Sequence, residues 1–233
     1  MTHPKQTPRA LAPDLWVVEH ALKLSAGVAL GTRSTIVRLR DGGLWVHSPG
    51  PLTPDLAEGV RAMGEVRVLV APNLWHHLFL EDWRVEWPEA RVYATPGLAE
   101  KQTNLHVDEV LADAAPAVWK GEIEQLRIAG MPKMNEFVFR HVESGTLVLT
   151  DLCFNMRESD SWWTRFFMRI NGVWQTFGPS RLFKTMVEDR DALEQSVDRL
   201  LEWEFERVIV AHGDVVESDG YAALERARPA FSK

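Results

Sequence analysis

Histidine and aspartate side chains follow the apolar, strand-like segments of this chain. The segments LWVH, VRVLVAPN, TLVLTD and RVIVAHGD each contain such residues at their ends or lead directly into them. The residues concerned are His47, His76, His77, Asp151, His212 and Asp214. Imidazole and carboxylate groups together are typical ligands of zinc, iron and manganese. If the four strand ends meet at one edge of a sheet, several metal ligands converge there.

Each of these residues alone has a simpler interpretation. A histidine at a strand end more often makes a structural hydrogen bond than binds a metal, and an aspartate there often caps the next turn. Adjacent histidines such as His76 and His77 point to opposite sides of an extended segment and face one centre only at a bend. Only the combination of residues therefore favours a metal site.

The placement of these residues depends on a series of predicted strands and helices. Apolar runs predict strands at 15–19, 34–40, 44–47, 66–71, 91–94, 123–128, 136–142, 146–151 and 207–211. Helices are predicted from 54 behind an N-cap at Thr53, from 74, within 159–185, at 189–205 and at 220–228. This order predicts an α/β fold with a sheet core covered by helices. Residues 1–13 are expected to form a flexible N-terminal arm, and 14–233 a single domain, because no Gly/Pro-rich linker divides the chain.

The composition narrows the class of protein. The 233 residues are 45% hydrophobic and 25% charged, as in ordinary globular proteins. The net charge of −7 argues against nucleic acid as a partner and against strong binding to anionic lipid. A single cysteine, Cys153, cannot form an internal disulfide, and no apolar stretch approaches the roughly 20 residues of a membrane span. The composition predicts a cytoplasmic protein and leaves its oligomeric state open.

The order of these motifs over about residues 15–228 resembles the metallo-β-lactamase-like superfamily. A hairpin and a helix come first, then a strand leading into the metal motif, a distant aspartate and a late histidine. The resemblance implies an αββα sandwich, with mixed sheets covered by helices, and a metal site at one edge that most often supports hydrolysis. The segments LWVHSPG and APNLWHHLF resemble a divergent, uncharacterised branch of that superfamily.

The metal motif departs from the superfamily pattern H-x-H-x-D-H. Pro72 and Leu74 stand where the first two histidines are expected, and His76 stands in place of the aspartate. Met131 occupies the position of the mid-chain histidine. The first metal position therefore lacks three ligands, and the resemblance leaves room for one ion at most.

The second metal position is better matched. His77 corresponds to the last histidine of the motif, Asp151 to the bridging aspartate and His212 to the late histidine. With His76 in place of the motif aspartate, these residues are expected to hold one divalent ion. Zinc is the first expectation for this ion, with iron or manganese as alternatives.

The expected function is hydrolysis of an ester, lactone or similar small molecule by a mononuclear metal enzyme. Asp214 is the candidate catalytic group that orients the water or accepts its proton. His47 is expected to contact the metal ligands without binding the metal itself. The alternative is a non-catalytic ligand- or partner-binding protein on the same fold, because three expected ligands are missing.

An aromatic cluster between 159 and 185 allows three interpretations. Trp162, Trp163 and Phe166 either pack into the core, line a pocket for an apolar substrate, or form an interfacial patch with the neighbouring Arg165 and Arg169. The substrate pocket is the interpretation adopted for these three aromatic residues. The negative net charge argues against the membrane-surface alternative.

Overall fold

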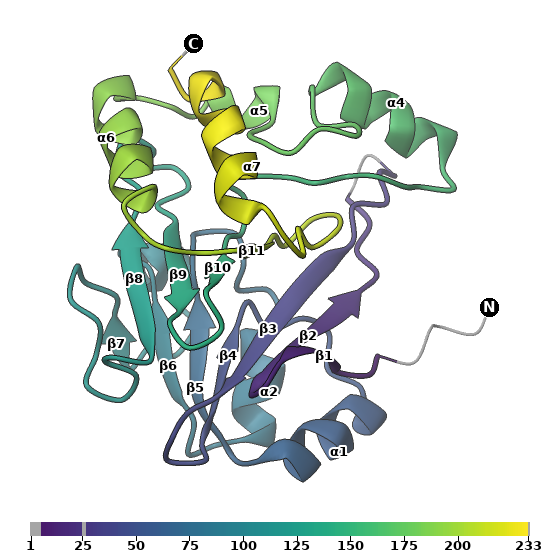
Figure 1. The fold of residues 1–233 in the computed structure, drawn as a ribbon. Helices are drawn as coiled ribbons and strands as arrows, with labels where there is room; N and C mark the ends of the chain where they lie inside the picture. The colour runs from purple at the N-terminus through teal and green to yellow at the C-terminus, as the bar shows by residue number, and fades with distance from the viewer. Residues whose placement is uncertain (1–5, 25–26, 233) are drawn as a thin grey trace.

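The computed structural model describes residues 6–24 and 27–232 as two β-sheets packed face to face (Figure 1). The first sheet has the order β1-β2-β3-β4-β5-β6-β7 and the second the order β11-β10-β9-β8. The strands of the first sheet are β1 (Arg9–Ala12), β2 (Leu15–His20), β3 (Thr32–Arg38), β4 (Leu44–His47), β5 (Val66–Ala71), β6 (Arg91–Ala94) and β7 (Glu109–Val110). Those of the second are β8 (Ile123–Arg127), β9 (Phe137–His141), β10 (Thr146–Val148) and β11 (Arg207–Ile209).

Helices cover the outer face of each sheet, which completes four layers. The first sheet carries α1 (Pro54–Met63), α2 (Leu80–Glu86) and α3 (Leu98–Lys101), whose apolar side chains share one buried cluster with the sheet. The second sheet carries α5 (Arg181–Lys184), α6 (Arg190–Leu200) and α7 (Gly220–Ala227) in the same way. In Figure 1, α6 and α7 lie on the opposite side of the molecule from α1 and α2. The predicted αββα sandwich of mixed sheets is confirmed.

Local sequence explains several of these elements. The Asp41-Gly42-Gly43 turn joins β3 and β4 as an antiparallel hairpin in which Arg38 pairs with Leu44. Helix α1 begins where Thr53 Oγ1 accepts a hydrogen bond from the Leu56 backbone N–H at 3.3 Å, as the predicted N-cap requires.

Parallel pairing determines where the functional residues emerge. Strands β4, β5 and β6 run parallel to one another, and β10 runs parallel to β11. The ends of parallel strands lie at the same edge of a sheet, and the segments after β4, β5, β10 and β11 come together at that edge. This edge carries His76, Asp151 and His212.

The structure differs from the predicted elements at several points. Part of the expected N-terminal arm, Arg9–Ala12, is an edge strand paired antiparallel with β2, while residues 1–5 lie outside the described residues. The segment after Pro72 forms turns, and α2 begins only at Leu80, because the side chain of Asn73 bonds the backbone of that segment. Strand β10 ends at Val148, so Asp151 lies on the following turn.

A short additional helix lies beyond the four layers. Helix α4 (Trp162–Ile170) is at the periphery of the molecule in Figure 1. It begins behind Ser161, whose side chain accepts a hydrogen bond from the backbone N–H of Thr164. Across the described residues, no helix has both the length and the apolar character needed to cross a bilayer.

Candidate metal centre

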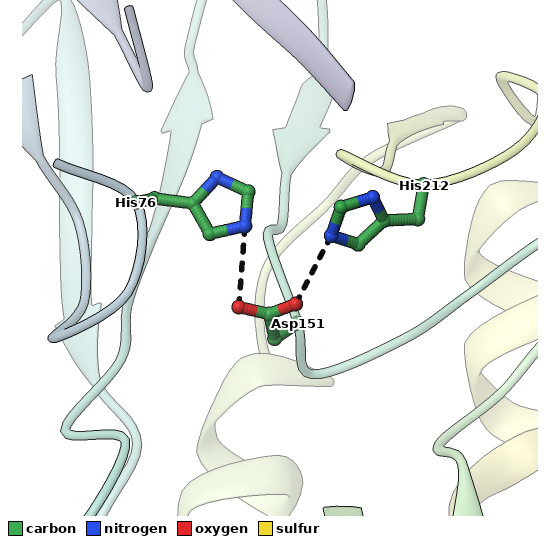
Figure 2. Close-up of side chains that lie close together, drawn as sticks. All are labelled: His76, Asp151 and His212. Atoms are coloured by element: carbon green, nitrogen blue, oxygen red, sulfur yellow. Dashed lines mark ion pairs between the residues drawn. The ribbon is translucent and has the colours of Figure 1, made fainter. Parts of the chain in front are cut away.

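Three side chains meet at the common edge of the two sheets (Figure 2). His76 Nε2 lies 3.2 Å from Asp151 Oδ2, and His212 Nε2 lies 3.2 Å from Asp151 Oδ1. One ligand atom from each residue lies within 4.8 Å of the other two. Asp151 and His212 are buried and His76 is largely so, and the three come from segments that are far apart in the sequence.

His76 is oriented by the segment that follows β4. Its Nδ1 lies 2.7 Å from the hydroxyl of Ser48, so Nε2 turns toward Asp151. Ser48 itself has a left-handed backbone with φ of 52°, which is uncommon for a residue with a side chain. A buried network holds this conformation, because Ser34 Oγ donates to the Ser48 carbonyl at 2.9 Å and accepts from the Gly50 backbone N–H at 2.8 Å.

His20 completes that network in a single tautomer. The one hydrogen of the Ser34 hydroxyl is committed to the Ser48 carbonyl, so His20 Nε2 donates to Ser34 Oγ at 2.9 Å. His20 Nδ1 is buried and has no hydrogen-bond partner among the described residues. Burial lowers the pKa of His20 to about 4, which keeps the ring neutral near pH 7.

His212 is fixed by contacts from both sheets. Its Nδ1 lies 2.7 Å from the Gly31 carbonyl oxygen. The buried Arg33 of β3 donates to the carbonyl oxygens of Val210 and Gly213, on either side of His212, at 2.5 and 2.6 Å. Gly213 has φ of 97°, and a Cβ atom there would lie 2.3 Å from the Asn155 carbonyl oxygen. The turn that presents His212 therefore requires glycine at this position.

Asp151 is positioned by a second buried carboxylate. The carboxylate of Glu136 accepts hydrogen bonds from the backbone N–H groups of Thr150, Asp151 and Leu152 at 2.9–3.3 Å. Asn73 Nδ2 donates to Asp151 Oδ2 at 2.8 Å and to Glu136 Oε2 at 3.3 Å. These bonds within the protein fix the turn and one carboxylate oxygen of Asp151 without the help of a ligand.

The charges of the three groups depend strongly on one another. Burial alone favours the neutral acid, but the adjacent His76 and His212 hold the pKa of Asp151 well below its usual range. Burial likewise opposes charge on His76, but Asp151 and Glu136 outweigh it and raise the pKa of His76. Burial, followed by the charge of Asp151, raises the pKa of Glu136. The centre therefore favours a cation beside an ionised Asp151.

The hydrogen bonds of His212 test whether a metal ion fits. A carbonyl oxygen only accepts, so His212 Nδ1 carries the proton that it donates to Gly31. In the neutral ring, Nε2 then has a lone pair directed at an ionised carboxylate oxygen of Asp151. That contact is favourable only when a second proton or another cation lies between the two atoms. Two imidazole nitrogens and one carboxylate are a donor set that suits a divalent ion, and one ligand atom from each residue lies within 4.8 Å of the other two.

A cavity of about 250 Å³ opens beside these three residues. The three side chains form part of its wall, and most of the remaining lining is aliphatic or aromatic. The apolar lining includes Leu22, Leu30, Phe79, Phe154, Phe167, Met168 and Val173. Such a cavity accommodates an apolar group next to a small number of polar atoms.

The sequence predicted four ligands, and the structure brings three of them together. His77 lines the cavity but lies outside the group of His76, Asp151 and His212. Its side chain is half-buried, and burial, then the charge of Lys101, lowers its pKa. At this bend the adjacent histidines face different surroundings, and only His76 turns toward Asp151.

Two other predicted residues lie away from the group. Asp214 is exposed and is not among the residues that line the cavity, so no contact supports its expected catalytic role. His47 is buried against Trp45 and Phe139, and neither ring nitrogen has a hydrogen-bond partner among the described residues. Its neighbour Ser48 makes the contact to His76 that was expected of His47.

The three aromatic residues predicted to line a substrate pocket are not among the residues that line this cavity. Trp162, Trp163 and Phe166 are exposed, and the cavity is lined instead by Phe167 and Met168. The sequence contained the helix, but it did not indicate which face packs inward. Cys153 is buried in the core, as a small hydrophobic residue.

Sequence reasoning missed the residues that position the ligands. Glu136, Asn73, Ser48 and Arg33 are all buried polar residues near the centre. Glu136 and Arg33 lie in or beside apolar strand segments. A charged residue there is expected to be buried and therefore to need a polar partner. That signal indicates a partner without identifying it, and Asn73 and Ser48 give no comparable signal.

Comparison with known proteins supports the fold. A family described as a domain of unknown function, DUF4336, matches residues 13–161. A metallo-β-lactamase from Pontibacter korlensis superposes with a TM-score of 0.68 at 14% identity, covering 97% of this chain and 98% of that one. The metallo-β-lactamase FIM-1 from Pseudomonas aeruginosa, in a mono-zinc form, gives 0.67 at 12% identity over 97% and 96% of the two chains. None of the curated proteins matches this sequence.

The buried neutral His20 predicts a specific loss of stability in acid. Its pKa of about 4 in the folded chain lies below the value of about 6.5 in the unfolded chain, so the unfolded chain binds more protons between these values. The contribution of His20 to the free energy of unfolding is therefore complete above pH 6.5, and it is lost progressively as the pH drops toward 4. Urea unfolding at pH 7 and pH 5 should show a shallower pH dependence in His20→Gln, by up to about 1.4 kcal/mol per pH unit. An unchanged slope would contradict the neutral, donor-only role of His20.

The carboxylate of Glu136 provides a second test. Glu136→Gln replaces one acceptor oxygen with an NH₂ group that faces backbone N–H donors, so it should destabilise the fold by about 2–3 kcal/mol in urea unfolding. If the centre binds zinc, its affinity for the ion should fall about 10–100-fold, because Asp151 loses its orientation. The control Glu188→Gln removes an exposed ion pair with Lys133 and should cost less than about 1 kcal/mol. Equal stability of Glu136→Gln and the wild type would show that the turn does not depend on this carboxylate.

Proposed function

Because the chain belongs to the DUF4336 family and has the metallo-β-lactamase-like fold, we propose that it is a mononuclear metal-dependent hydrolase of an ester, lactone or similar small molecule. One observation carries the proposal. Two imidazole Nε2 atoms and the carboxylate of Asp151 converge beside an apolar cavity, and the other nitrogen of each imidazole is already hydrogen-bonded.

His76, Asp151 and His212 would hold the ion. Three protein ligands are the number found in catalytic zinc sites, which keep a further position for water or substrate. A bound divalent ion supplies Lewis acidity for the attack of water on a carbonyl group. The Ser48 and Gly31 contacts keep both Nε2 atoms aimed at the shared point, and Asn73 holds one oxygen of Asp151, so the ligand set needs little rearrangement.

The cavity determines what reaches the centre. Phe154, Phe167, Met168 and Val173 line it, so an ester or lactone with an apolar acyl part would bury that part there. Phe154 also stacks on His212, with ring centroids 5.2 Å apart, which restricts the movement of that imidazole. Apolar walls exclude water other than the reacting molecule and strengthen the electrostatic interactions of the centre.

A non-catalytic ligand-binding protein is the second candidate. It is favoured by the two 3.2 Å contacts of Asp151, because protons on His76 Nε2 and His212 Nε2 would satisfy them without a metal ion. Under this alternative the cavity binds an apolar ligand and no reaction follows.

Metal content tests the proposal. After exposure to zinc and removal of the excess, purified protein should retain about one equivalent by elemental analysis. Asp151→Asn and His212→Gln should lose most of it while retaining the wild-type circular dichroism spectrum. The matched control His77→Gln changes a histidine that lines the same cavity and should keep its zinc.

Activity separates the two candidates. A panel of esters and lactones with acyl groups of increasing length should reveal turnover that a chelator abolishes and zinc restores. Asp151→Asn should abolish the same turnover. Protein that retains no zinc would overturn the metal site, and zinc-loaded protein without turnover on the panel would favour the ligand-binding alternative.

A further inference from the structure

Helix α4 presents an apolar face to solvent. Trp162, Trp163, Phe166 and Ile170 are 69%, 36%, 46% and 53% exposed. Residues three to four positions apart share one side of a helix, so these four side chains form a single patch, here called the helix face. The opposite side of α4 is buried through Thr164 and Met168.

The helix face adjoins the mouth of the cavity. Four side chains both line the cavity and are exposed, and they are here called the mouth. The mouth consists of Leu24, Trp75, Leu78 and Leu182. Phe167, one helical turn from Trp163, lines the same cavity and connects the two sets.

Hydrogen bonds attach the surrounding segments to α4. The Ala29 backbone N–H donates to Thr164 Oγ1 at 3.0 Å, which ties Ala29 to the helix. Arg181 donates to the Ile170 carbonyl oxygen at 3.0 Å, which places Leu182 beside the C-terminal end of α4. The helix face and the mouth therefore belong to one apolar surface around the cavity entrance.

This surface carries a positive charge on an acidic protein. Residues 157–185 contain five Arg and Lys and two Asp and Glu, while the whole chain has a net charge of −7. Arg165, Arg169, Arg181 and Lys184 have no ion pair with any other residue in the described part of the chain. Arg169 instead lies over the ring of Trp174, and Arg165 and Arg181 donate to backbone carbonyl oxygens. These cations are free of carboxylate partners and border an exposed aromatic patch.

We propose that the helix face and the mouth dock on an anionic lipid surface. Tryptophan and arginine are the side chains that bridge the apolar and polar layers of a membrane interface. The local positive charge complements acidic headgroups, although the acidic remainder of the protein does not. A second copy of this chain would bring the same cations together, which disfavours self-association through this surface. Docking would place the cavity entrance against the acyl layer, and it requires neither a metal ion nor catalysis.

Vesicle sedimentation tests the docking. Vesicles with equal amounts of phosphatidylcholine and phosphatidylglycerol should carry down the full-length protein, and vesicles of phosphatidylcholine alone should do so much less. The double variant Trp162→Ser, Phe166→Ser should bind at least about tenfold more weakly, because two apolar side chains leave the interface. Arg165→Gln, Arg169→Gln should lose the preference for the anionic vesicles.

A matched control distinguishes docking through this surface from nonspecific adsorption through any exposed apolar side chain. Val85→Ser, Val110→Ser removes two side chains that are 71% and 56% exposed on α2 and β7, and binding should stay at the wild-type level. Brominated phosphatidylcholine in the vesicles should quench tryptophan fluorescence in the wild type and much less in Trp162→Phe, Trp163→Phe.

Three results would overturn the proposal. These are the absence of sedimentation with either vesicle, equal loss of binding in the valine control, and equal binding to neutral and anionic vesicles. A concentration-dependent dimer that Trp162→Ser, Phe166→Ser abolishes would instead assign the surface to a second copy of the chain, and would also overturn it.

Discussion

The candidate centre depends on one constraint, the ionised carboxylate of Asp151 lying between two imidazole Nε2 atoms. Each imidazole has its Nδ1 committed elsewhere, His76 to the Ser48 hydroxyl and His212 to the Gly31 carbonyl. Neither ring can turn away without breaking a partly buried hydrogen bond, which costs about 1 kcal/mol. The arrangement therefore brings an ionised carboxylate and two imidazole Nε2 atoms to one point between the sheets.

The two sheets must be packed for this point to exist. Ser48 and His76 follow strands of the first sheet, whereas Asp151 and His212 follow strands of the second. Polar contacts cross between them, because Arg33 of β3 holds the turn of His212 and Asn73 bonds Asp151. The apolar cluster between the sheets, which includes Trp45 and Phe139, holds the two sheets together. The centre is therefore complete only when both sheets are packed together.

Much of the fold was predictable because apolar runs define strands and the parallel strands end at one edge. The patterns RVIVAHGD and TLVLTD pointed to His212 and Asp151, which the structure brings together with His76. The choice between His76 and His77 was not predictable, since it depends on how Asn73 bends the chain. Which face of α4 points inward depends on what the helix packs against. The cavity is therefore lined by Phe167, whereas the neighbouring Phe166 is exposed. The edge strand β1 has the short sequence RALA, which carries no strand pattern of its own. Its strand conformation depends on pairing with β2 in the folded protein.

Anomalous diffraction at the zinc absorption edge, from crystals grown with zinc, tests the central claim most directly. We expect one peak per chain at about 2.0–2.2 Å from His76 Nε2, His212 Nε2 and a carboxylate oxygen of Asp151. Both Nδ1 contacts, to Ser48 and to Gly31, should persist in that structure. Crystals with no peak at this point, or with zinc bound through His77 and without Asp151, would contradict the account.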